Sequence, residues 1–174
     1  MLSQRTIKNK ITCSGVGLHT GKKVKLTFHP AEPNTGILFR RIDGDKVVDI
    51  PATAKNVGET TLSTTLVYGD YKISTIEHLL SALAGTGVDN CIIDCDGPEI
   101  PIMDGSSTQF VFLIQTAGIV EQNAVKKFVY VTKSVQVQRD DAVARIKPYD
   151  GFRVTFTLEF DLSLIHISEP TRRL

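Results

Sequence analysis

The chain has 174 residues, 41% of them hydrophobic and 22% charged, so it is long enough for one complete globular domain and part of a second. Its 20 basic and 19 acidic residues leave a formal net charge of +1, which gives neither nucleic acid nor an anionic membrane surface a strong electrostatic attraction. We therefore expect no nucleic-acid partner.

The cysteines and the N-terminus indicate the cellular compartment. Cys13, Cys91 and Cys95 are odd in number and lack Cys-x-x-Cys spacing, which argues against a disulfide framework and against a thiolate zinc site. The N-terminus has no charged segment followed by an apolar one, and no apolar run approaches the length of a membrane span. The sequence therefore predicts a cytoplasmic protein with no transmembrane segment.

Short strands dominate the first part of the chain. Alternating apolar and polar residues, interrupted by glycine and proline, are typical of short β-strands. This pattern predicts strands at residues 6–12, 24–28, 36–41, 47–50, 62–67 and 71–73. A glycine-rich turn, GVGLHTG at residues 15–21, joins the first two strands.

The stretch STIEHLL at residues 74–80 predicts the start of a helix that ends near Gly85. Ser74 followed three residues later by Glu77 is the capping-box pattern, in which each side chain accepts the backbone N–H of the other residue. A helix-capping role accounts for the position of Glu77 without any catalytic function. Alternatively, Glu77 and the adjacent His78 belong to an active site.

The two sides of this helix differ in residue size. One side carries the apolar residues that pack on a sheet, namely Ile76, Leu79, Leu80 and Leu83. His78 lies roughly opposite, and its helical neighbours are the small residues Ser81, Ala82 and Gly85. Because a solvated face more often carries Lys, Glu or Gln, we expect a second body to pack against this side.

The second half of the chain predicts another helix and then a new domain. Residues 90–94 predict a strand, and Ser106 or Ser107 begins a helix that ends at Gly118. The polar stretch at residues 121–127 is the predicted boundary, so we expect a complete domain over residues 1–124. Strands at 129–137, 143–146 and 152–160 then predict the start of a truncated second domain over residues 125–161.

The last residues, 162–174, differ from everything before them. Their sequence, LSLIHISEPTRRL, continues no strand pattern and resembles the translation of a transposase sequencing adapter. We expect this tail to be non-native and the chain to end where a truncated gene runs into the adapter. His166 and Glu169 therefore receive no functional role.

Local spacing alone does not establish a metal site. A catalytic zinc ion needs three protein ligands and an open position for water, and no carboxylate or histidine stands at helical spacing from His78. His19 is a further candidate because Gly17 and Gly21 let its loop approach a ligand, although tight-turn glycines explain that loop equally well.

Three motifs together resemble one family. They are GVGLHTG at residues 15–21, STIEHLLSALAGTGVDN at 74–90 and GPEIPIMDGSS at 97–107. In this order and spacing they resemble the N-terminal half of the zinc-dependent UDP-3-O-acyl-N-acetylglucosamine deacetylases of lipid A biosynthesis, over residues 1–161. The resemblance implies an α+β fold: a two-layer domain of one sheet and two helices, the first of two similar domains whose helices face each other across the active site.

The resemblance also implies roles for individual residues. His78 is implied as one of three Zn²⁺ ligands, and Glu77 as the general base that takes a proton from the zinc-bound water. The other ligands, a His and an Asp one helical turn apart, and a His acting as general acid belong to the family's second domain. His19, Leu62 and Phe160 are implied to lie near the substrate groove, with Phe160 contacting the nucleotide sugar.

Two interpretations follow for the chain as a whole. By resemblance, the full-length protein is a monomeric zinc-dependent deacetylase of UDP-3-O-acyl-N-acetylglucosamine, and this chain alone lacks part of the active site. The alternative is a non-catalytic α/β interaction module that binds a partner through the helix face of His78, with Glu77 acting only as a cap.

Overall fold

The structure is a computed structural model that describes residues 1–157. The chain divides into two compact units, Met1–Lys127 and the residues from Phe128 onward. Phe160 and the predicted non-native tail at 162–174 lie outside the described residues. In the part that the structure describes, no helix is long and apolar enough to cross a membrane.

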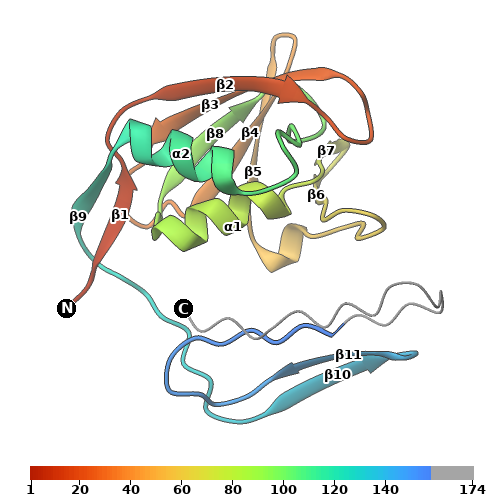
Figure 1. The fold of residues 1–174 in the computed structure, drawn as a ribbon. Coiled ribbons are helices and arrows are strands. Elements are labelled where there is room, and N and C mark those ends of the chain that lie inside the picture. The colour runs from red at the N-terminus through yellow and green to blue at the C-terminus, as the bar shows by residue number, and fades with distance from the viewer. Residues whose placement is uncertain (158–174) are drawn as a thin grey trace. The chain divides into compact units, whose positions relative to one another are not determined.

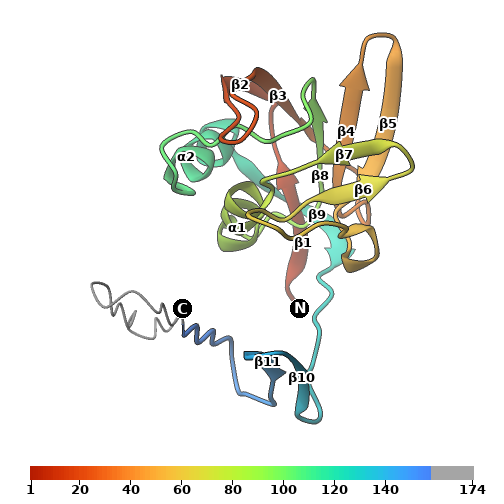
Figure 2. The same ribbon diagram turned by 90° about the vertical axis from the view of Figure 1, so that its right-hand side faces the viewer.

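The first unit is built on a five-stranded sheet with the order β2-β3-β8-β4-β5 (Figures 1 and 2). Its strands are β2 (Ile11–Val16), β3 (Lys23–Pro30), β8 (Cys91–Cys95), β4 (Ile37–Asp43) and β5 (Lys46–Pro51). Neighbouring strands are antiparallel except for β4 and β8, which are parallel. In β3, Val24, Leu26 and Phe28 are buried, whereas Lys23 and Lys25 are exposed. Such alternation of buried and exposed side chains is typical of a strand with one face on the core.

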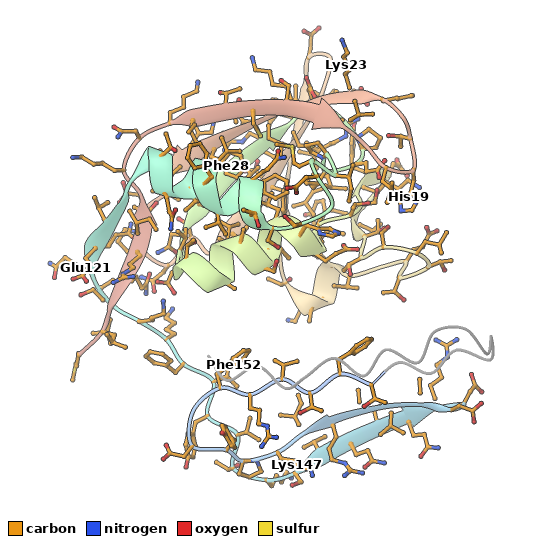
Figure 3. All side chains as sticks on the ribbon, in the orientation of Figure 1. His19, Lys23, Phe28, Glu121, Lys147 and Phe152 are labelled. Atoms are coloured by element: carbon orange, nitrogen blue, oxygen red, sulfur yellow. The ribbon has the colours of Figure 1, made fainter. Side chains whose placement is uncertain are left out.

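Two helices, α1 (Glu77–Thr86) and α2 (Thr108–Ala117), cover one face of this sheet (Figure 1). The core between the two layers includes Phe28, Phe39 and Ile93 from the sheet, Leu79 and Leu83 from α1, and Phe110 from α2, all with 0–1% exposure. Figure 3 shows Phe28 in this layer. The predicted apolar face of α1 is therefore confirmed, as is the two-layer α+β fold.

A separate two-stranded sheet pairs β1 (Ser3–Ile7) with β9 (Ile119–Val125). The single strand predicted at 6–12 is wrong, because the chain turns at residues 8–10 and only then enters β2. At this turn the N–H of Lys8 donates to the carbonyl of Gly118, and the N–H of Asn9 donates to that of Ala117, the last residue of α2. The polar stretch predicted as a boundary also contributes to a strand, since β9 extends to Val125.

The hairpin of β6 (Leu66–Tyr68) and β7 (Tyr71–Ile73) leads into α1, and a short 3-10 helix, η1 (Ala54–Asn56), precedes it. The strand predicted at 62–67 begins only at Leu66. Leu62 has a φ of 63°, a left-handed conformation that no β-strand accommodates. Residues 58–65 therefore form a loop rather than a strand.

The second unit contains a hairpin of β10 (Val135–Arg139) and β11 (Ala142–Ile146). The strand predicted at 129–137 thus begins later than expected. Residues 152–157 form no continuous strand, so the described part of the predicted third strand is absent. Pro148 has no backbone N–H to donate to a strand ladder, and Gly151 has a φ of 118°, a conformation outside the β region.

Candidate active site at the start of helix α1

The start of α1 differs from the predicted capping box. The helix begins at Glu77, and its N-cap residue Ile76 has a helical backbone and no side-chain cap. Ser74 instead pairs with the segment 98–100: its N–H donates to Pro98 O at 2.9 Å, and its carbonyl accepts the N–H of Ile100 at 2.9 Å. The Ser74 hydroxyl also donates to Pro98 O, so it is not available to the helix.

Glu77 points to a neighbouring loop rather than to the backbone of its own helix. Its carboxylate accepts the backbone N–H of Thr64, at 3.1 Å from Oε2 and 3.4 Å from Oε1. The N–H of Ile76 donates back to the carbonyl of Thr64 at 3.4 Å. These bonds tie the loop 58–65, which carries the 85% exposed Leu62, to the first turn of α1.

His78 is half-buried on the first turn of the same helix. Its carbonyl accepts the hydroxyl of Ser81, while its imidazole forms no hydrogen bond within the described residues. Part of the small-residue side is covered inside the domain itself: Ala82 is buried, and the Ser81 hydroxyl hydrogen-bonds to Ser107 at the start of α2. Gly85 remains exposed.

The described residues place one histidine imidazole, that of His78, at the start of α1. Within residues 1–157, no group of three or more His, Cys, Asp and Glu side chains is arranged to hold a metal ion. An imidazole nitrogen is a donor that zinc prefers, so the side chain of His78 fits one position of a zinc site.

His19 lies in the loop between β2 and β3 and is exposed (Figure 3). This loop is closed by hydrogen bonds from Gly17 N–H to Lys22 O and from Gly21 N–H to Gly17 O, both 3.0 Å. A Cβ atom added to Gly17 would lie 2.4 Å from Oε2 of Glu99 and 2.5 Å from Oγ1 of Thr20. Only glycine fits at this position.

A buried carboxylate, not predicted from the sequence, joins this loop to α1. Glu99 has 0% exposure, and its Oε1 accepts the His19 N–H at 2.9 Å while its Oε2 accepts the Thr20 N–H at 2.8 Å. Oε1 also accepts the hydroxyl of Thr75 at 3.1 Å. Burial raises the pKa of Glu99, but these hydrogen bonds lower it by more, so the pKa lies below its usual value.

The structure therefore brings most of the predicted site residues to one end of the first unit. In Figure 1 the β2–β3 loop, the loop before β6 and the start of α1 lie at the same end of the sheet. Hydrogen bonds tie the loops of His19 and Leu62 to the residues around Glu77. The other histidine in this unit, His29, is engaged elsewhere, since its Nε2 lies 2.7 Å from Asp94 Oδ2 on the sheet.

An apolar groove of about 420 Å³ lies beside α2, apart from the residues just described. It is lined by Cys13, Met103, Thr108, Gln109, Phe112 and Leu113. Burial raises the pKa of the Cys13 thiol to about 11, so this thiol stays protonated near neutral pH and is not an activated nucleophile.

Fold and site together define an α+β domain that presents an adjacent carboxylate and imidazole at the start of one helix. The sequence matches, over residues 4–172, the family described as UDP-3-O-acyl N-acetylglycosamine deacetylase. The chain belongs to this family. The matched range extends into the segment 162–174, whose predicted non-native origin stays a prediction.

Curated relatives support the same assignment. The chain is 59% identical over 161 residues to the UDP-3-O-acyl-N-acetylglucosamine deacetylase of Methylococcus capsulatus and 58% identical over 161 residues to that of Saccharophagus degradans. Both alignments cover 92% of this chain and 53% of the relative. The chain is also 58% identical over 170 residues to the deacetylase of Cellvibrio japonicus, an alignment that covers 98% of this chain and 56% of the relative. The chain spans about half the length of the curated relatives it matches.

Proposed function

We propose that the protein takes part in lipid A biosynthesis by removing the N-acetyl group of UDP-3-O-acyl-N-acetylglucosamine with the help of zinc, and releases acetate. The observation that carries this proposal is the pair at the start of α1: the half-buried His78 imidazole without a hydrogen-bonding partner in the described residues, next to the Glu77 carboxylate that is held by the Thr64 N–H. The names of the relatives supply the substrate.

In this proposal His78 holds the zinc ion through its imidazole. Zinc, when bound, lowers the pKa of its water and polarises the amide carbonyl. The carboxylate of Glu77 acts as general base. The Thr64 N–H holds this carboxylate in place, and the carboxylate oxygens keep lone pairs that can accept the proton.

The remaining parts of the mechanism come from outside the described residues. We propose that two further zinc ligands, a His and an Asp, and a His that protonates the leaving amine belong to a second domain of the kind the resemblance implies. The loops of His19 and Leu62 border the groove that receives the UDP sugar.

The experiment measures bound zinc and acetate release for the full product of the gene and for its variants. We expect His78→Ala to lose both zinc and activity, and Glu77→Gln to keep zinc while losing activity. If the 174-residue chain alone binds one zinc ion tightly and deacetylates the UDP sugar, the assignment of the missing ligands is wrong. If the full product releases no acetate, the non-catalytic module becomes the better interpretation.

A further inference from the structure

Glu99 is the point at which three distant segments meet. Two of its partners, His19 and Thr20, belong to the loop after β2 and lie 80 and 79 positions from Glu99 in the sequence. The third, Thr75, lies 24 positions away and directly precedes the first turn of α1. Glu99 itself touches neither Glu77 nor His78 through a hydrogen bond among the described residues.

The contacts of Glu99 fix the orientation of the His19 loop as well as its position. Two consecutive backbone N–H groups reach different oxygens of one carboxylate, so the loop is held at two points. Gly17 lies against the same carboxylate, because a Cβ atom there would be 2.8 Å from the carboxyl carbon. Gly17, His19 and Thr20 of the loop therefore all lie against the carboxylate of Glu99.

Thr75 links the same carboxylate to α1. Its φ is 59°, an unusual conformation for a β-branched residue, and such strained residues persist only where their surroundings hold them. Its hydroxyl shares Oε1 of Glu99 with the N–H of His19. Oε1 of Glu99 thus connects the His19 loop to Thr75, which lies two residues before Glu77.

We propose that Glu99 is a positioning residue for the substrate groove: it sets the location of the His19 loop relative to the Glu77–His78 pair and thereby controls the affinity for the UDP sugar. This inference rests on the proposed function, because it assigns the loop to the groove. Glu99 has 0% exposure, so the role we propose for it acts through the loop that it holds.

The first experiment measures amide hydrogen exchange in the loop 15–22 and does not depend on activity. Glu99→Gln replaces one carboxylate oxygen by an amide group that faces a backbone N–H and cannot accept from it. We expect the His19 and Thr20 amides to exchange roughly tenfold faster or more, as the loss of a buried charged acceptor implies. Unchanged exchange would overturn the proposal.

The matched control is Asn90→Asp, an equally isosteric change at the far end of α1. Asn90 also has 0% exposure, and its side chain bonds to Gln4, Gln122 and Gly36. We expect the Asn90→Asp variant to have a lower melting temperature than wild type but unchanged amide exchange in the loop 15–22. If both variants accelerate the loop equally, Glu99 acts through general stability and the proposal is wrong.

The second experiment is steady-state kinetics on the full product of the gene. We expect Glu99→Gln to raise KM roughly tenfold and to change kcat by less than about twofold, because Thr64 still holds Glu77. In a His19→Ala background the same change is expected to have a much smaller effect on KM. Additive effects of the two changes would contradict an action of Glu99 through this loop.

A second variant reaches the same contact from the loop. Gly17→Ala leaves the charge of Glu99 intact but places a methyl group 2.4 Å from its Oε2, so the loop has to move. The expected result is again faster amide exchange in the loop and a raised KM.

If no form of the protein releases acetate, the proposed function fails, while the exchange experiment still decides whether Glu99 holds the loop. If acetate is released with an unchanged KM in both variants, the function stands and the positioning role falls.

Discussion

At the N-terminal end of α1, two residues other than glycine adopt left-handed backbone conformations, Thr75 (φ 59°) and Leu62 (φ 63°), besides Gly21 (63°) of the His19 loop; beyond its C-terminal end such conformations fall on Gly87 (76°) and Asn34 (68°). Glycine and asparagine adopt positive φ at little cost, but a β-branched or bulky residue does so only under constraint. The end that carries Glu77 and His78 is therefore the strained one.

The buried polar groups at the two ends differ in the same way. Glu99 carries a pKa below its usual value and accepts two backbone N–H groups of one loop, while Asn90 is neutral, accepts only the Gly36 N–H from the backbone and donates to Gln4 of β1 and Gln122 of β9 at 2.8 and 2.7 Å. Strain that persists in a folded domain is concentrated at functional sites. The comparison thus separates an end with a strained backbone at Thr75 and Leu62, where the proposed active site lies, from an end held by neutral side-chain hydrogen bonds.

The largest expected effect is on catalysis at the strained end. Glu77→Gln keeps an oxygen for the Thr64 N–H but removes the base, so we expect kcat to fall by roughly 10²–10⁴. Zinc content and the melting temperature are expected to stay close to wild type. Acetate release and metal analysis on the same preparation test this. A variant with wild-type kcat would remove Glu77 from the mechanism and, with it, the functional half of the comparison.

The largest expected effect on stability lies at the end that carries Asn90. Asn90→Asp places a carboxylate against the side-chain oxygens of Gln4 and Gln122, and we expect a loss of about 2–4 kcal/mol in the free energy of unfolding. The control is Asn123→Asp, an exposed position on β9, for which the expected change is within about 0.5 kcal/mol. Urea unfolding of both variants measures the difference, and equal values would contradict it.

At the strained end, Thr75→Val keeps the shape of the buried side chain and removes its hydroxyl. Glu99 then loses one of its three donors, so we expect a loss of about 1–2 kcal/mol in the free energy of unfolding. The double variant with Glu99→Gln is expected to lose less than the sum of the two changes, because the neutral amide of glutamine is a weaker acceptor for the Thr75 hydroxyl than the carboxylate. Strictly additive losses in a double-mutant cycle would separate Thr75 from Glu99.

How much of this the sequence predicts depends on whether the responsible contacts are local. The strands at 24–28, 36–41 and 47–50 and the apolar face of α1 follow from residue alternation and helical period, and the structure confirms them. The motifs also identify the family, with its two-layer α+β fold.

The features that the sequence does not predict all depend on distant partners. Ser74 matches a helix cap locally, but pairing with residues 98–100 takes its backbone and hydroxyl. Glu99 has partners up to 80 positions away. One signal was available: an acidic residue enclosed by Pro98, Ile100 and Pro101 in an otherwise apolar stretch is expected to be buried, and a buried charge needs partners.

Acid is expected to weaken the strained end selectively. The folded protein holds the pKa of Glu99 below its usual 4.5, so the ionised form stabilises the fold above that pH, and this contribution is lost as the pH falls through the lower folded value. The stability difference between wild type and Glu99→Gln should therefore be constant above about pH 5.5 and shrink in more acidic solution. Urea unfolding at several pH values measures it, and a difference that grows toward acid would reverse the assigned sign.

The smallest expected effect concerns Leu62, where strain and substrate contact can be separated. Leu62→Gly relieves the left-handed conformation but makes the unfolded chain more flexible, so the two terms oppose each other and we expect a net change within about 1 kcal/mol. Leu62→Ala keeps the strain and removes most of the side chain, which is 85% exposed and contributes little to the core. If the side chain contacts the UDP sugar, both variants raise KM by the same factor while only the glycine variant relieves the strain. An unchanged KM in both variants would show that Leu62 does not contact the UDP sugar. The proposed function of this end would then rest on Glu77, His78 and the His19 loop.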